Sequence, residues 1–174
     1  MARNVEIKAR VSNIEALLPR VVALADHGPE SIAQDDTFFA CAVGRLKLRA
    51  FADGHGELIA YERPDAAGPK TSDYRITPVA DPDALRATLA RALGVTGRVV
   101  KQRTLFLVGR TRVHLDRVEG LGDWLELEVV LREGELVEHG VAEARAVLAS
   151  LQVDATQLVS GAYVDLLRGL ETPT

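Results

Sequence analysis

Polar and apolar residues alternate along much of this chain, and the alternation predicts strands. Residues 4–11 alternate at every step, which is the period of a strand with two unlike faces. Residues 45–51, 111–118 and 124–131 show the same period. Further strands are expected within residues 36–43, 57–63, 72–77 and 98–108.

Turn and helix signals separate these strands. The sequence Asp-Gly-His-Gly at residues 53–56 predicts a hairpin turn. Ser12 followed by Glu15 is a capping-box pattern and predicts a helix, which Pro19 is expected to kink or restart because proline lacks an amide proton. A second helix is expected over residues 81–94, which open on Asp-Pro and close on Gly.

The C-terminal part of the chain shows helical spacing. Leu148 and Leu151 fall on one expected helix, and Tyr163 falls on the last. Residues 64–71, with Pro, Gly and Lys, are expected to form a mobile loop. This order of strands and helices predicts a single α+β domain covering residues 1–174.

Composition narrows the class of protein. A chain of 174 residues, 47% of them hydrophobic, is long enough for one sizeable core and short for two. A single cysteine, Cys41, excludes an internal disulfide framework. The sequence has no apolar run of transmembrane length and no signal-like N-terminus, so we expect a cytoplasmic protein. The net charge of −4 disfavours binding to nucleic acid or an anionic membrane, so an anionic ligand would need a local basic cluster.

One face of the predicted strands collects charges of both signs. Its basic members are Lys8, Arg10, Arg45, Lys47, Arg49, Arg63, Arg75, Lys101, Arg103 and Arg112, and its acidic members are Glu6, Asp116, Glu126 and Glu128. For any single strand, this is the solvent-facing side of an ordinary antiparallel sheet. Because the other face is apolar and helices are available to cover it, we interpret the charged face as the concave inside of a curved sheet.

A lumen lined by these charges must hold water or ions, since unpaired charges in a dry interior are very costly. A triphosphate would supply negative charge, because arginine forks bind phosphate oxygens in bidentate fashion and lysine acts as a point charge. The carboxylates would repel phosphate and need a reason of their own. Mg²⁺ usually takes one or two carboxylates together with phosphate oxygens and water, so the candidate metal ligands are Glu6, Asp116, Glu126 and Glu128.

Several segments of the chain together resemble the CYTH superfamily, which unites class IV adenylyl cyclases, thiamine triphosphatases and inorganic triphosphatases. The family signature is an N-terminal Glu-x-Glu-x-Lys strand, which appears here as Asn4-Val5-Glu6-Ile7-Lys8. Further matches are the strand at residues 45–49, the Lys101/Arg103 strand and the run HLDRVEGLGDWLELE at residues 114–128. The last run is the most specific, and the resemblance spans nearly the whole chain.

The resemblance implies an eight-stranded antiparallel tunnel with flanking helices, in which basic side chains grip a triphosphate and acidic ones hold Mg²⁺ or Mn²⁺. Carried over by position, the triphosphate-binding residues are Lys8, Arg45, Lys47, Arg49, Arg75, Lys101, Arg103 and Arg112. The metal ligands are Glu6, Glu126 and Glu128, with Asp116. Family members are often dimeric, so a homodimer is a further expectation of the resemblance.

The chain departs from the family signature at Asn4, where the first glutamate usually stands. An amide oxygen can coordinate a cation but carries no charge, so this position bears on catalysis more than on phosphate binding. Lys8, or a water held by a carboxylate such as Glu6, is a candidate catalytic base. His114 is another, although a histidine on a strand is more often a packing or hydrogen-bonding residue, which is the interpretation we favour.

Three classes of function follow from these features. The first is an enzyme, either a class IV cyclase-like lyase or a triphosphatase that acts on ATP, thiamine triphosphate or inorganic triphosphate. The second is a catalytically weak or inactive module that binds polyphosphate or a nucleotide, for which Asn4 is the best support. The third, a carrier barrel, would need an apolar lumen, and the charged strand faces argue against it. No glycine-rich phosphate loop or nucleotide fingerprint is present, so all three triphosphates stay open as substrates.

Overall fold

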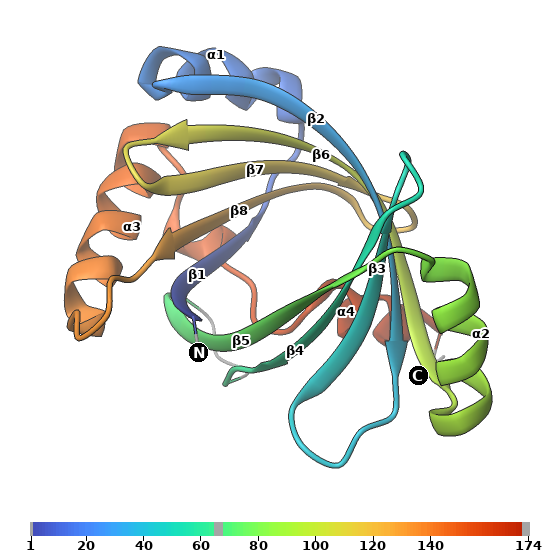
Figure 1. The fold of residues 1–174 in the computed structure, drawn as a ribbon. Coiled ribbons are helices and arrows are strands. Elements are labelled where there is room, and N and C mark those ends of the chain that lie inside the picture. The colour runs from blue at the N-terminus through green and yellow to red at the C-terminus, as the bar shows by residue number, and fades with distance from the viewer. Residues whose placement is uncertain (1, 65–67, 172–174) are drawn as a thin grey trace.

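A computed structural model describes residues 2–64 and 68–171 and shows a closed β-barrel with helices packed around it (Figure 1). Eight strands close in the order β1-β5-β4-β3-β2-β6-β7-β8, and every neighbouring pair is antiparallel. The α+β class and the eight-stranded antiparallel tunnel are thereby confirmed.

The predicted strands are present, and the ends of most of them differ from the predicted ones by a few residues. The strands are β1 (Ala2–Arg10), β2 (His27–Phe39), β3 (Arg45–Phe51), β4 (Gly56–Glu62), β5 (Lys70–Val79), β6 (Val95–Val108), β7 (Thr111–Val118) and β8 (Gly122–Val130). The helices are α1 (Ile14–Leu24), α2 (Pro82–Leu93), α3 (Val137–Leu151) and α4 (Tyr163–Glu171), with a short 3₁₀ helix η1 (Ala155–Gln157) before α4. Strands β3 and β7 have the ends that the sequence predicted.

Strand β2 starts well before the expected residue, and β5 extends past both of its expected ends. Strand β2 begins at His27 rather than near Asp36, because its first part is defined by backbone pairing with β6 and not by side-chain alternation. The ladder contains a register shift near its start, which further hides the pattern. Strand β5 begins at Lys70, inside the segment 64–71 that was expected to be a loop. Residues 65–67 of that segment lie outside the described residues.

The start of α1 differs slightly from the expected one. Asn13, and not Ser12, is the N-cap, and its side chain accepts a hydrogen bond of 2.8 Å from the Glu15 amide. The helix continues through Pro19 as one element without a restart, because its apolar face is anchored on the barrel. Asp81 caps α2, as predicted.

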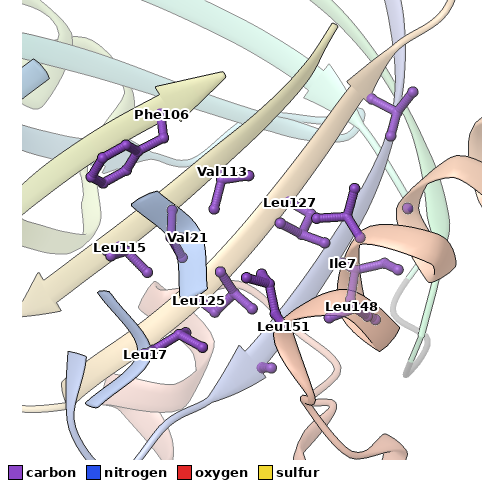
Figure 2. Packing of buried hydrophobic residues seen from close by; sticks show 14 of the residues in the cluster. Ile7, Leu17, Val21, Phe106, Val113, Leu115, Leu125, Leu127, Leu148 and Leu151 are labelled. Atoms are coloured by element: carbon purple, nitrogen blue, oxygen red, sulfur yellow. The ribbon is translucent and has the colours of Figure 1, made fainter. Parts of the chain in front are cut away.

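The larger hydrophobic core lies outside the barrel wall, under α1 and α3 (Figure 2). Outward-facing side chains of β1 and β8, including Ile7, Leu125 and Leu127, share this core with Val21 of α1 and Leu151 of α3. Each of these five side chains is at most 1% exposed. Burying an aliphatic side chain of this size contributes roughly 1.5–3 kcal/mol, so the apolar faces turn outward to the helices and the charged faces turn into the lumen.

A second, smaller core fills one end of the barrel. Phe38, Val99 and Trp124 come from β2, β6 and β8 and pack with Tyr163 and Val164 at the start of α4. The Trp124 and Tyr163 rings meet edge to face with 5.6 Å between their centroids. Helix α4 therefore closes the end of the barrel at which β2 ends and β8 begins.

No helix within residues 2–64 and 68–171 is long and apolar enough to cross a membrane.

Candidate functional site

The barrel encloses a cavity of about 400 Å³. Its basic lining residues are Lys8, Lys47, Arg49, Arg63, Lys101, Arg103 and Arg112, and its acidic ones are Glu6, Asp36, Glu57, Glu126 and Glu128. Basic side chains thus outnumber acidic ones in the cavity, although the chain as a whole has a net charge of −4. A positive cavity with low-dielectric walls inside an acidic protein concentrates anions at that place.

Asp36 of β2 gathers three basic side chains inside this cavity. Lys47 Nζ donates to Asp36 Oδ2 at 2.9 Å, and Lys101 Nζ donates to the same oxygen at 3.4 Å. Arg49 binds both carboxylate oxygens, at 2.8 and 2.9 Å. Burial opposes ionisation of Asp36, but Arg49, Lys101 and Lys47 hold its pKa well below the ordinary value. The charged carboxylate therefore orders three cations that a phosphate chain can share.

Arg103 of β6 is fixed by the fully buried Asp116 of β7. Its guanidinium donates two hydrogen bonds of 2.7 Å to the two carboxylate oxygens, and the Tyr163 hydroxyl donates a third of 2.9 Å. Burial opposes ionisation of Asp116, yet Arg103 lowers its pKa. Asp116 does not line the cavity, whereas Arg103 does. The structure therefore places Asp116 with Arg103, whose guanidinium binds both of its oxygens, and a metal-binding role for Asp116 stays a prediction.

His114, Glu126 and Glu128 form a group that could hold a metal ion. One potential ligand atom from each lies within 4.8 Å of the other two. Burial, followed by the charge of Arg103, lowers the pKa of His114 to about 3, so its imidazole is neutral and keeps a lone pair at physiological pH. Burial and the carboxylates of Glu126 and Glu6 raise the pKa of Glu128 to about 7. A divalent cation would relieve this repulsion.

Two buried polar atoms in the cavity wall support a cation site. Asn4 Oδ1 and His114 Nδ1 have no hydrogen-bond partner among the described residues, and both side chains are nearly inaccessible. A buried acceptor without a partner costs about 1–3 kcal/mol. Carboxylate and amide oxygens suit Mg²⁺ and Mn²⁺, and the imidazole adds a softer nitrogen donor. The residues present therefore fit a divalent cation.

Lys8 and Lys101 are buried lysines that hold their protons weakly. Burial lowers the pKa of Lys8 to about 8 and the pKa of Lys101 to about 7. Lys8 Nζ lies 3.9 Å from the Glu126 carboxylate and donates a hydrogen bond of 3.3 Å to the Gly161 carbonyl. It also lies 4.1 Å from the centre of the Tyr163 ring. Both lysines can therefore exchange a proton near neutral pH.

The structure brings together six of the expected triphosphate-binding residues, namely Lys8, Lys47, Arg49, Lys101, Arg103 and Arg112. Arg45 is not in the cavity lining, because it lies at the closed end and pairs with Asp165 of α4 at 2.7 Å. Arg75 is exposed and faces outward, since Tyr74 and Ile76 take the inward positions on either side of it. The structure therefore does not place Arg75 with the other basic residues of the cavity, because charge alone does not distinguish the two faces of this polar strand.

The remaining expected residues are placed as follows. Glu6 lines the cavity, but its carboxylate pairs with Arg63 at 2.8 Å and does not join the metal-capable group. Arg10 lies at the barrel end with its guanidinium 5.0 Å from the Trp124 ring. His114, which was interpreted as a packing residue, instead belongs to the group that could hold a metal.

Sequence reasoning missed several buried polar side chains on the inner face of the barrel. Asp36 lies on the same buried face of β2 as Gln34 and Phe38. A predicted strand that began before Asp36 would have assigned it to this inner face. Lys70 is buried and registers opposite Glu6, but its segment was expected to be a loop. Another is Tyr163 at the start of α4, which no local sequence pattern places inside the barrel.

Comparisons with known proteins agree with this geometry. The chain belongs to the CYTH domain family, whose model matches residues 2–163. It is 26% identical over 171 residues to adenylate cyclase CyaB from Aeromonas hydrophila, with 91% of this chain and 85% of that protein covered. The resemblance noted from the sequence is thereby confirmed.

Solved structures share the fold. The chain is similar to the PH1012 protein from Pyrococcus horikoshii OT3, with a TM-score of 0.84, 24% identity, and 94% of this chain and 99% of that chain covered. It is also similar to the putative adenylyl cyclase HpAC1 from Hippeastrum, for which a dominant triphosphatase activity is described. That likeness has a TM-score of 0.70 and 15% identity, and covers 99% of this chain and 98% of the other.

Proposed function

We propose that the protein binds a triphosphate inside the barrel and cleaves it with Mg²⁺ or Mn²⁺ as the cofactor. One observation carries the proposal: a single cavity contains both the basic set around Asp36 and the group of His114, Glu126 and Glu128. Phosphoryl transfer uses both parts, since basic side chains position the phosphates and a divalent cation neutralises them. Hydrolysis is the reaction proposed here, because it needs no particular group on the triphosphate, whereas cyclisation needs a ribose hydroxyl on the same molecule.

The chain's own residues divide this work by position. Lys47, Arg49 and Lys101 would hold phosphate oxygens in the arrangement that Asp36 imposes. Arg103 lies 3.6 Å from Glu126, so it would connect the phosphate-binding side of the cavity with the metal-binding side. When bound, Mg²⁺ or Mn²⁺ would offset the charge that develops on phosphate oxygens as the bond breaks. Most of the catalysis would then come from positioning and electrostatics.

Lys8 is the residue best placed to move a proton. Its pKa of about 8 leaves a fraction of the amine neutral at physiological pH, so it could accept the proton of an attacking hydroxyl. The nearby Glu126 carboxylate would stabilise the ammonium that forms. Glu6 would act indirectly, through its ion pair with Arg63.

Cyclisation of a nucleoside triphosphate is a second candidate reaction. The similarity to a relative named adenylate cyclase CyaB favours it. Cyclisation would use the same contacts to the phosphates, but a ribose hydroxyl would replace water as the nucleophile and pyrophosphate would leave.

Identification of the products tests the proposal directly. The purified protein is incubated with ATP, thiamine triphosphate or inorganic triphosphate, with Mg²⁺ or Mn²⁺, and with a chelator in parallel. Orthophosphate is the expected product, and it should disappear with the chelator. Cyclic AMP with pyrophosphate would establish cyclisation instead. Saturable binding without any product would leave a triphosphate-binding module, the alternative that Asn4 supports.

Triphosphate binding should be accompanied by proton uptake at pH 8. Lys101 is mostly neutral at that pH because its pKa is about 7, and a bound polyanion favours its ammonium form. We expect uptake approaching roughly one proton, seen as a difference in calorimetric enthalpy between Tris and HEPES buffers. A Lys101→Met variant should lose most of this difference. Equal enthalpies in both buffers for the wild-type protein would contradict the assignment.

Replacing Asn4 with glutamate should strengthen binding of Mg²⁺ or Mn²⁺. The change adds a carboxylate at a buried position whose amide oxygen has no partner among the described residues, so we expect a gain of roughly tenfold in affinity. Calorimetric titration with each ion measures it, and Asn4→Gln, which keeps the amide, is the matched control. Unchanged affinity in Asn4→Glu would remove position 4 from the metal site.

A further inference from the structure

The segment that leads into α4 contacts the buried lysines of the cavity. Ala162 and Tyr163 both line the cavity. Lys8 Nζ donates a hydrogen bond of 3.3 Å to the Gly161 carbonyl and lies 4.1 Å from the centre of the Tyr163 ring. Lys101 Nζ lies 5.6 Å from the centre of the same ring. Because the face of an aromatic ring attracts ammonium groups, this one side chain stabilises both lysines in their charged form.

The hydroxyl of Tyr163 reaches a second pair of charged residues. It donates a hydrogen bond of 2.9 Å to Asp116 Oδ2, which also accepts a bond of 2.7 Å from Arg103. The tyrosine is only 5% exposed, so these contacts are shielded from water. One residue of α4 therefore links this helix to Lys8, Lys101 and Arg103, which come from β1 and β6.

Helix α4 is also anchored by contacts that lie outside the cavity. Arg168 Nε donates a hydrogen bond of 2.9 Å to the Thr96 carbonyl of β6. Val164 packs closely on Gly97 of the same strand, where the side chain of any other residue would overlap it. Arg168 is exposed and does not line the cavity. The packing of α4 on the barrel can therefore be weakened at Arg168 without changing a residue of the site.

We propose that Tyr163 is a positioning residue of the site, so that docking of α4 on the barrel and binding of a triphosphate favour each other. The inference rests on the proposed function, since the triphosphate must bind the cations that Tyr163 contacts. Undocking of α4 would take the ring away from Lys8 and Lys101 and the hydroxyl away from Asp116, so the undocked protein would bind a triphosphate more weakly. Because coupling between two events is reciprocal, a bound triphosphate must stabilise docked α4 by the same factor.

Hydrogen exchange followed by mass spectrometry measures this coupling on the wild-type protein. The probe is inorganic diimidotriphosphate, whose P–N–P links resist hydrolysis, with Mg²⁺ present. At saturation we expect amide exchange in α4 to slow about tenfold, in line with the loss of the ring contacts on undocking. Helix α2 is the internal control, because it packs against β2 and β3 and none of its residues lines the cavity. Exchange in α2 should change less than about twofold.

Variants separate this coupling from the stability of α4 itself. Tyr163→Leu, which removes the ring and the hydroxyl, should lower affinity for the probe roughly tenfold in calorimetry and reduce the slowing in α4 to less than about threefold. Tyr163→Phe keeps the ring beside the lysines and should restore most of both effects. Arg168→Leu is the matched control: it should speed α4 exchange in the free protein, yet keep the tenfold slowing by the probe and an affinity within about twofold of wild type.

The possible outcomes distinguish the inference from the proposed function. Binding of the probe without slower exchange in α4, or equal slowing in α4 and α2, would overturn the inference and leave the proposed function intact. The same slowing in Tyr163→Leu as in Arg168→Leu would also overturn it, because α4 would then respond to the ligand without Tyr163. Absence of binding by the wild-type protein would remove the proposed function, and the inference with it.

Discussion

Replacing Glu126 and Glu128 together with glutamine should abolish metal-dependent turnover. The two carboxylates are the anionic members of the group that could hold a metal, so their loss leaves His114 without charged partners there. We expect affinity for Mn²⁺ to fall by more than about a hundredfold and kcat/KM by at least as much. Calorimetry with Mn²⁺ gives the first quantity and product formation from each triphosphate gives the second.

Glu126 lies near Lys8 and Arg103, so folding of the double variant is checked by circular dichroism before the assays. Burial and the neighbouring carboxylates already raise the pKa of Glu128 to about 7, so a neutral amide there removes repulsion from the protein without metal. The matched control is Glu119→Gln with Glu133→Gln, which removes two exposed acidic charges elsewhere. Triphosphate-dependent activity close to normal in the Glu126/Glu128 variant would refute the assignment of the metal site.

The barrel was predictable from sequence because the alternation of polar and apolar residues and the resemblance to the CYTH superfamily both indicate strands. On β7, Val113 and Leu115 alternate with Arg112 and His114, so the strand and both of its faces follow from the chain alone. The first part of β2 was hidden because its exposed residues form a ladder with β6 without an apolar face of their own. Backbone pairing of this kind is non-local, and a single sequence does not carry it.

The candidate site was predictable as a set of charges but not as a set of contacts. Face and charge identify Arg103 and Asp116 as lumen candidates, yet they do not reveal that the two are bonded to each other. Tyr163 enters the site from a helix far along the chain, so neither its ring above Lys8 nor its bond to Asp116 follows from spacing. Which carboxylates meet a metal and which meet an arginine is decided by tertiary packing.

Asp116→Asn should strongly destabilise the fold if Asp116 orients Arg103 and is not held for a metal. The pair is buried, with Asp116 0% exposed and the Arg103 side chain 6% exposed, and it carries two hydrogen bonds of 2.7 Å. Removing one charge leaves the guanidinium buried with a weaker partner, which costs about 3–5 kcal/mol. Chemical denaturation of the metal-free protein measures the change in the free energy of unfolding.

The chain offers a control with the same bonding geometry at the surface. Asp35 accepts hydrogen bonds of 2.8 and 2.6 Å from Arg98, whose side chain is 62% exposed, so Asp35→Asn should cost no more than about 1 kcal/mol. If Asp116 were a metal ligand, its replacement by asparagine would raise the free energy of unfolding of the metal-free protein, because it would relieve repulsion between carboxylates. Equal or greater stability of Asp116→Asn without metal would therefore return Asp116 to the metal site, whereas a loss several times that of Asp35→Asn would place it with Arg103.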